Sequence, residues 1–177
     1  ANIRAINPSF DFITNKLTLN FRWLGLINII LPNAKIIHCK RNPIDTCLSI
    51  FQKIFPVNGN EYTFNLNEIA EYYKLYMDLF VYWKKIIPNS FYEIKYENLI
   101  QNQEKETRKL LDYCNITWNK KCLNFSSTNR AVRTSSDAQV RKNIYTSSSN
   151  RWMFYKNELS GLIETLKMSN YFKKNIN

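Results

Sequence analysis

Glycine is scarce in this chain, with only three among 177 residues. Loops that cradle phosphate groups commonly need several glycines, so the sequence contains no glycine-rich nucleotide loop. Apolar runs are also short. The longest candidate, WLGLINIILP, ends at Pro32 and falls below the roughly 18 residues that predict a transmembrane helix. The composition therefore favours neither a glycine-rich phosphate loop nor a membrane span.

Histidine occurs once, and the four cysteines (Cys39, Cys47, Cys114 and Cys122) match no zinc-ligand spacing. We therefore expect no metal site, and we predict free thiols in a reducing compartment. The first residues, ANIRAINPSF, include no initiator methionine and no secretion-signal pattern. This beginning suggests an excised piece of a longer chain.

Apolar residues and basic charge are abundant. Hydrophobic residues make up 45 % of the chain, including eleven Phe and eleven Tyr, which is enough to form the core of one domain. Lys and Arg outnumber Asp and Glu by 25 to 14, so the net charge is +11. Such an excess predicts an anionic partner, which could be a nucleotide, a nucleic acid, a membrane surface or a sulfated polymer.

Helical and strand-like patterns alternate along the chain. This alternation predicts an α/β fold with a parallel sheet, although two strands are few and suggest further sheet upstream. Loops are expected over 57–67 and 125–150, and Asn20 is a candidate helix cap. The predicted helical regions are 20–31, 45–55, 67–87, 97–114 and 151–168, and the predicted strands are 34–39 and 90–96. Pro43 suits the first turn of the second of these helices.

The first predicted strand leads directly into a basic turn, Lys40-Arg41-Asn42-Pro43. Ligands of open α/β sheets bind beyond the carboxyl ends of strands, and a guanidinium there can grip a phosphate in a bidentate fork. Ser49, about two turns into the next helix, could share that ligand. The alternative is that Arg41 caps the helix or pairs with Asp45, and that Ser49 is an ordinary helix residue. These residues alone leave both readings open.

The segment IIHCKRNPIDTCLSIF resembles the 3′-phosphate-binding segment of sulfotransferases that use 3′-phosphoadenosine 5′-phosphosulfate (PAPS). Three more blocks match in the family's order: ITNKLTLNFRWLGLINIILPNAKIIHCKRNP, FYEIKYENLI and AVRTSSDAQVRKNIYTSSSNRW. The likeness is closest to bacterial sulfotransferases often fused to tetratricopeptide repeats and to tyrosylprotein sulfotransferases. It implies a P-loop-NTPase-like parallel sheet flanked by helices, with 1–177 as a single, partial catalytic domain.

The resemblance also implies roles for single residues. Arg41 and Ser49 match the pair that binds the 3′-phosphate, and Tyr96 matches the tyrosine that contacts the adenine. Without the resemblance, Tyr96 would be read as a core aromatic at a strand end. Lys16 matches the catalytic lysine that faces the transferred sulfuryl group.

The C-terminal block supplies the remaining matches. Ser135 or Ser136, together with Arg151, match the residues that close over the nucleotide. Arg133 and Arg141 are nearby cations that could act in the same way. For Arg141 we favour simple solvation, because exposed charges seldom have a specific role.

Several family features have no match. The first strand, its phosphosulfate loop and the general base that follows the loop are missing, and the only histidine, His38, is expected to be a satisfied core residue. Asn15 and Thr18 replace the family's usual Asp and Pro around the lysine. We therefore expect this chain alone to be incomplete and inactive.

The implied reaction transfers a sulfuryl group from PAPS to an acceptor hydroxyl and releases adenosine 3′,5′-bisphosphate (PAP), with no metal. The acceptor would be a protein tyrosine, a sugar or a small alcohol, and tetratricopeptide repeats could lie upstream. The expected location is the bacterial cytoplasm, or the Golgi lumen for a eukaryotic tyrosylprotein sulfotransferase-like parent. The alternatives are an inactive nucleotide- or partner-binding fragment and a basic nucleic-acid-binding module.

Overall fold

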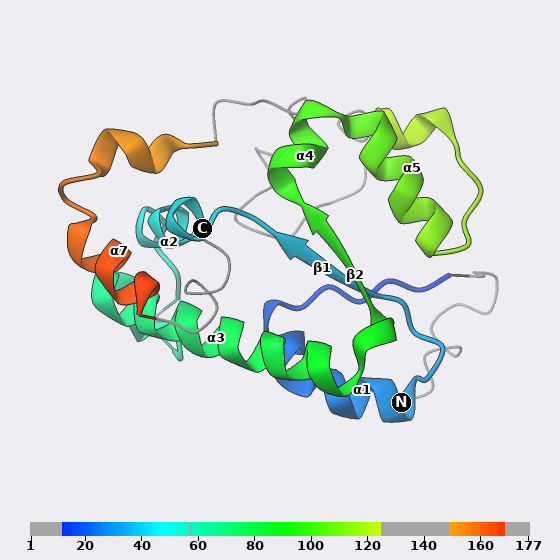
Figure 1. Ribbon diagram of the computed structural model, residues 1–177, viewed down its shortest axis with the longest axis horizontal. Coiled ribbons are helices and arrows are strands. Elements are labelled where there is room, and N and C mark those ends of the chain that lie inside the picture. The colour runs from blue at the N-terminus through cyan, green and yellow to red at the C-terminus, as the bar shows by residue number, and fades with distance from the viewer. Residues whose placement is uncertain (1–11, 57, 125–148, 169–177) are drawn as a thin grey trace.

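The computed structural model describes residues 12–56, 58–124 and 149–168 (Figure 1). These residues form a helix-rich α/β structure. Its strands are β1 (Ile36–Lys40) and β2 (Phe91–Lys95), and its α-helices are α1 (Leu24–Ile30), α2 (Pro43–Phe51), α3 (Leu66–Ile86), α4 (Tyr96–Gln101), α5 (Gln103–Tyr113) and α7 (Ser160–Lys167). Short 3₁₀ helices are η2 (Thr18–Trp23), η3 (Glu61–Phe64), η4 (Pro88–Ser90), η5 (Lys120–Leu123) and η8 (Arg151–Tyr155).

The two strands pair in parallel, with Ile36 opposite Phe91 and Lys40 opposite Lys95. The prediction of an α/β fold with a parallel sheet is confirmed for these strands, whereas the P-loop-like part of that prediction stays a prediction. Parallel pairing places both carboxyl ends at one edge of the sheet. Figure 1 shows α2 and α4 beginning at that edge.

Aromatic contacts join helices to both faces of the sheet. On one face, the His38 ring lies 3.6 Å from the ring of Phe80 in α3, and Phe80 also contacts Phe91 at 5.2 Å. On the other face, Tyr92 stacks on Tyr113 of α5 with ring centroids 5.1 Å apart. This alternation follows from the two-residue period of a strand, because successive side chains point to opposite faces.

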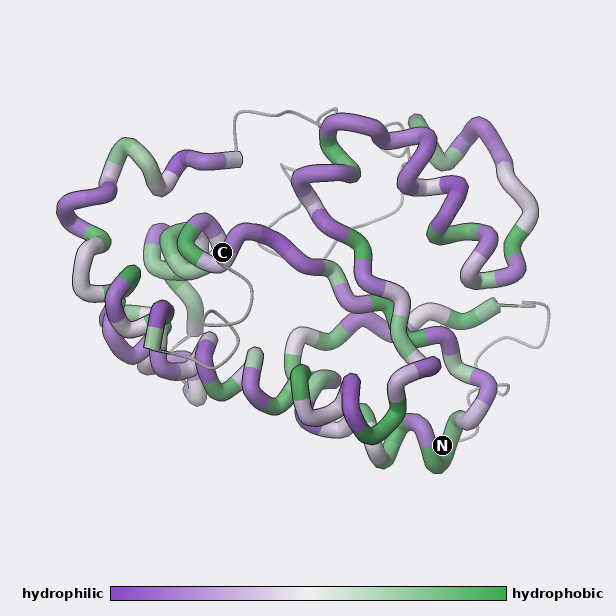
Figure 2. The backbone as a smooth tube through the Cα atoms, viewed as in Figure 1, coloured by the Kyte–Doolittle hydropathy of each residue, from purple (hydrophilic) through white to green (hydrophobic). Residues whose placement is uncertain are grey.

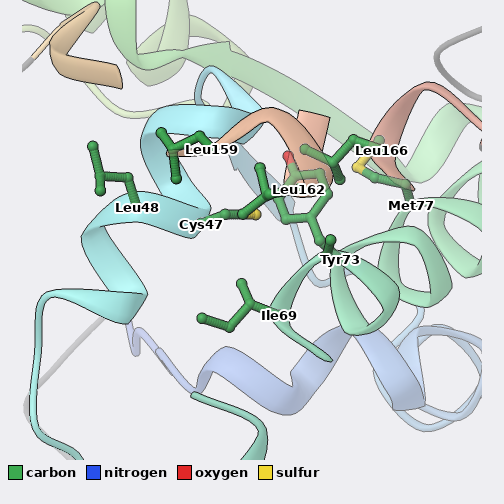
Figure 3. Packing of buried hydrophobic residues seen from close by; sticks show 9 residues of the cluster. Cys47, Leu48, Ile69, Tyr73, Met77, Leu159, Leu162 and Leu166 are labelled. Atoms are coloured by element: carbon green, nitrogen blue, oxygen red, sulfur yellow. The ribbon is translucent and has the colours of Figure 1, made fainter. Parts of the chain in front are cut away.

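The main core lies between α2, α3 and α7 (Figure 3). Helix α3 presents its buried side chains at helical spacing, which places them on one face toward the other two helices. The sequence pattern predicted α3 to within one residue at each end. The buried cluster consists of Cys47, Leu48, Ile69, Ala70, Tyr73, Met77, Leu159, Leu162 and Leu166.

Some predicted element boundaries were wrong. Helix α2 begins two residues before the predicted start, because Asn42 is its N-cap and accepts hydrogen bonds from the backbone N–H groups of Ile44 and Asp45 at 2.9 and 3.1 Å. Asn20 caps no helix. It lies within η2, and its side-chain amide donates to Asn15 at 2.8 Å.

Other helical predictions differ in detail. Region 20–31 is a 3₁₀ turn followed by a short α-helix, and region 151–168 divides into η8 and α7. The expected loop over 57–67 contains the 3₁₀ turn η3 and the first turn of α3. No helix in the described ranges is long and apolar enough to cross a bilayer.

The η2–α1 segment docks on α3 through Trp83. The indole Nε1 of Trp83 donates to the carbonyl of Phe21 at 2.8 Å. Gly25 lies against the same ring, and a Cβ at this position would approach Trp83 to 2.7 Å. Glycine is therefore required at position 25 by a close approach.

We expect Gly25→Ala to lower the free energy of unfolding by about 1–3 kcal/mol, because the methyl group must displace the Trp83 ring. Gly161→Ala is the matched control, since its added Cβ meets no atom closer than 3.5 Å. The control should be neutral or stabilising by up to about 1 kcal/mol. Chemical denaturation measures both changes, and equal stability of the two variants would contradict the steric argument.

Candidate functional site

Arg41 and Tyr96 meet at the carboxyl edge of the sheet. They follow Lys40 and Lys95, which are opposite each other in the register. The guanidinium carbon of Arg41 lies 5.1 Å from the centre of the Tyr96 ring. Figure 2 shows the chain from the end of β1 to the start of α2 as hydrophilic. The edge thus combines a half-buried arginine with an aromatic ring.

Glu97 joins the two strand ends. Its Oε1 accepts a hydrogen bond from the backbone N–H of Asn42 at 2.7 Å. The Asn42 side chain in turn occupies the N–H groups of Ile44 and Asp45. The first N–H groups of α2 therefore already have acceptors, so an anion at this edge must be held mainly by side chains.

Asp45 connects α2 to a distant part of the chain. Its carboxylate is 2 % exposed and accepts hydrogen bonds from the backbone N–H groups of Asn150 at 2.7 Å and Trp152 at 3.0 Å. These two residues bracket Arg151. These two bonds occupy both carboxylate oxygens of Asp45, and the alternative that Arg41 pairs with Asp45 stays a prediction.

Ser49 lies one helical turn after Asp45, on the same face of α2. The side chain of Ser49 is half-buried, whereas that of Arg151 is exposed. The structure thus brings the segment that carries Arg151 to the helix that follows Arg41. Ser135, Ser136, Arg133 and Arg141 lie outside the described residues.

Lys16 lies in the segment 12–17, which precedes η2 and has no regular structure. Burial raises the pKa of the Cys39 thiol, and the positive charge of Lys16 opposes that rise. The charge of Lys16 therefore acts on Cys39, which lies in β1 two residues before Arg41. The hydrogen bond between Asn20 and Asn15 ties the chain beside Lys16 to η2.

His38 belongs to a polar network beneath α3. Its Nδ1 lies 3.1 Å from Oε1 of Glu93, and its Nε2 contacts the hydroxyl of Tyr76. Lys84 also donates to Glu93 at 2.8 Å. The prediction that His38 is a satisfied core residue is confirmed.

The contacts of Glu93 determine the ionisation state of its carboxylate and, through it, which ring nitrogen of His38 carries the hydrogen. The hydrogen bond from His38, with further help from Lys84 and Lys40, lowers the pKa of Glu93 to about 2, although burial acts in the opposite direction. The carboxylate is therefore ionised at neutral pH and can only accept, so Nδ1 of His38 carries the hydrogen.

We expect Glu93→Gln to lower the free energy of unfolding at pH 7 by about 1–2 kcal/mol. This value is smaller than the pKa shift alone implies, because water screens the partly exposed carboxylate. The folded-state pKa lies below the ordinary value of 4.5, so this stabilisation is present above pH 4.5 and is lost as pH falls toward 2. Urea titrations of both proteins across this range measure the difference. A difference that stayed constant from pH 7 to pH 2.5 would contradict the assigned pKa.

The described residues contain no group of three or more His, Cys, Asp or Glu side chains arranged to hold a metal ion. All four cysteines are free thiols, as predicted. Cys47 is part of the core, and burial raises the pKa of its thiol to about 12. The Cys47 thiol is therefore protonated and acts as a small apolar side chain.

Comparison with known proteins identifies the family. Residues 3–120 match the Sulfotransferase family. The chain belongs to the sulfotransferase family. The matched region of this sulfotransferase-family chain contains Lys16, Arg41, Ser49 and Tyr96, whereas Arg151 lies beyond it.

The sulfotransferase-family chain is also similar to an uncharacterized protein of Aquifex aeolicus (strain VF5). The two are 37 % identical over 164 residues, which cover 92 % of this chain and 21 % of that protein. The chain thus spans about a fifth of the length of this relative.

Sequence reasoning missed the contacts that three residues make at this candidate site: Asn42, Asp45 and Glu97. The Asn-Pro pair was a usable signal for Asn42, because Asn favours the N-cap and Pro the first helical position. Nothing near Asp45 or Glu97 in the sequence indicated their partners. Those partners lie 105 or 107 residues away for Asp45 and 55 residues away for Glu97.

Proposed function

We propose that the carboxyl edge of the sheet binds PAPS and supports transfer of its sulfuryl group to an acceptor hydroxyl. One observation carries this proposal: Arg41 and Tyr96 pair at the ends of adjacent parallel strands in a sulfotransferase-family chain. An arginine beside an aromatic ring suits a ligand that combines a phosphate with a purine base.

The nucleotide is held by side chains from several elements. Arg41 and Ser49 grip the 3′-phosphate, and Tyr96 contacts the adenine. Arg151 closes over the nucleotide from the C-terminal side, with Ser135 or Ser136 from the preceding segment. The occupied N-terminus of α2 supports a phosphate grip built from side chains rather than from backbone N–H groups.

The reaction is an in-line displacement at sulfur. The acceptor oxygen forms a bond to sulfur while the bond between sulfur and the 5′-phosphate oxygen breaks, and the acceptor proton leaves to a base. Lys16 stabilises negative charge that develops on the bridging oxygen, and PAP departs. His38 and Glu97 are engaged within the fold, so we assign neither as the base.

The acceptor class is the hydroxyl of a protein tyrosine, a sugar or a small alcohol. A nucleic-acid-binding module is distinguished by salt dependence, because contact with many phosphates gives a steep decrease of affinity with salt and a single nucleotide a shallow one. Turnover of PAPS with an acceptor distinguishes a transferase from a domain that only binds the nucleotide.

In the intact parent enzyme, we expect Arg41→Ala to weaken PAP binding by roughly 2–4 kcal/mol, because a charge-assisted phosphate contact is lost. Isothermal titration calorimetry measures the affinity. Arg108→Ala is a matched control, since Arg108 also lies over an aromatic ring, 4.0 Å from Trp118, but on α5 and outside the proposed site. Equal affinities of the Arg41 variant and the control would refute the assignment.

In the intact parent enzyme, we expect Lys16→Ala to lower kcat for sulfuryl transfer by about 10²-fold and to change PAP affinity little, because the lysine acts on charge present only in the transition state. The measurement is a PAPS turnover assay with phenolic and sugar acceptors, paired with PAP titration. Lys120→Ala, an exposed lysine in η5, is the control. A variant at Lys16 that binds PAP poorly but turns over normally would make this residue a binding cation only.

A further inference from the structure

The side chain of Asp45 is almost completely buried, and it accepts hydrogen bonds from a segment more than 100 residues away along the chain. Its two oxygens accept the backbone N–H groups on either side of Arg151, at 2.7 and 3.0 Å. A buried carboxylate is costly unless hydrogen-bonded, so these bonds strongly favour the docked position of the segment. We infer that Asp45 is a positioning residue that couples phosphate binding by Arg41 to the placement of Arg151.

Two further features hold the bracketed turn. Asn150 adopts a left-handed backbone conformation with φ of 62°, which asparagine tolerates better than most residues. Trp152 packs against the main core cluster. The chain on both sides of Arg151 is therefore fixed, while the Arg151 side chain itself stays exposed to reach a ligand.

The start of α2, which follows Arg41, is also held in place. Asn42 caps α2, and Glu97 holds the N–H of Asn42, so the start of the helix is fixed against the end of β2. Asp45 stands three residues beyond this cap, and Ser49 stands one turn further on the same face. Helix α2 therefore carries both Ser49, which belongs to the proposed phosphate site, and Asp45, which holds the segment of Arg151.

This arrangement makes nucleotide binding and segment docking reciprocal. A ligand that contacts both Arg41 and Arg151 binds fully only while the carboxylate holds the turn, so the ligand favours docking and docking raises the affinity. The inference rests on the proposed function, because PAP is the anion assigned to both arginines.

A double-mutant cycle tests the coupling. We expect Asp45→Asn and Arg151→Ala each to weaken PAP binding about tenfold, and the double variant to be weakened by about the same factor rather than about a hundredfold. Asn has almost the shape of Asp, but its amide cannot accept the second N–H. Independent, multiplicative effects would overturn the inference, and so would wild-type affinity of a folded Asp45→Asn protein.

Glu106→Gln is the matched control. Glu106 is also a buried carboxylate, 8 % exposed, but it pairs with Lys109 on α5 at 2.7 Å. This variant reports any general loss of stability on removing a buried charge, and we expect its PAP affinity to equal that of the wild type. A tenfold loss of PAP affinity in Glu106→Gln would show that the effect of Asp45→Asn reflects lost stability, and would overturn the inference.

Hydrogen exchange on the wild-type protein gives a second measurement that does not depend on whether Asp45→Asn folds. We expect PAP to slow exchange of the Asn150 and Trp152 amides, with a midpoint at the calorimetric dissociation constant. If PAP binds and these amides do not respond, the coupling is wrong and the proposed function stands. If the wild type binds no PAP, the proposed function fails, and the inference fails with it.

Discussion

Parallel pairing of β1 with β2 is the constraint on which the site depends. The register sets Lys40 opposite Lys95, so the residues that follow, Arg41 and Tyr96, emerge side by side. A shift of one residue would turn His38 away from Glu93 and from α3, and would remove its partners within the sheet. The same pairing therefore fixes both the polar network beneath α3 and the chemistry at the edge.

Two carboxylates, those of Glu97 and Asp45, hold the chain in place around the cationic edge, whereas Glu93 lies within the sheet. Glu97 and Asp45 each accept backbone N–H groups from another part of the chain, and Glu93 gathers His38 with two lysines. Hydrogen bonds of a buried carboxylate to backbone N–H groups hold the chain without neutralising a cation. In a chain of net charge +11, this arrangement preserves the positive potential that attracts an anion.

Local patterns predicted most elements and the parallel pairing of the two strands, but not the long-range contacts of Asp45 and Glu97. Apolar periodicity located α3 nearly to the residue, and strand-like composition located both strands. For α2, Pro43 was correctly expected in the first turn, but Asn42 was not recognised as the N-cap, and the helix ends at Phe51 rather than at residue 55. The role of Asp45 depends on a tertiary contact, for which a single sequence holds no local sign.

The core between α2, α3 and α7 has a consequence for biosynthesis. Helix α7 supplies Leu162 and Leu166 to that core, yet it follows the end of α3 by about 70 residues. At roughly 5–20 residues per second, the ribosome needs on the order of 4–14 s to add that stretch. Throughout this interval the apolar face of α3 has no α7 to cover it, so the nascent chain offers a binding surface to chaperones before α7 has been synthesised.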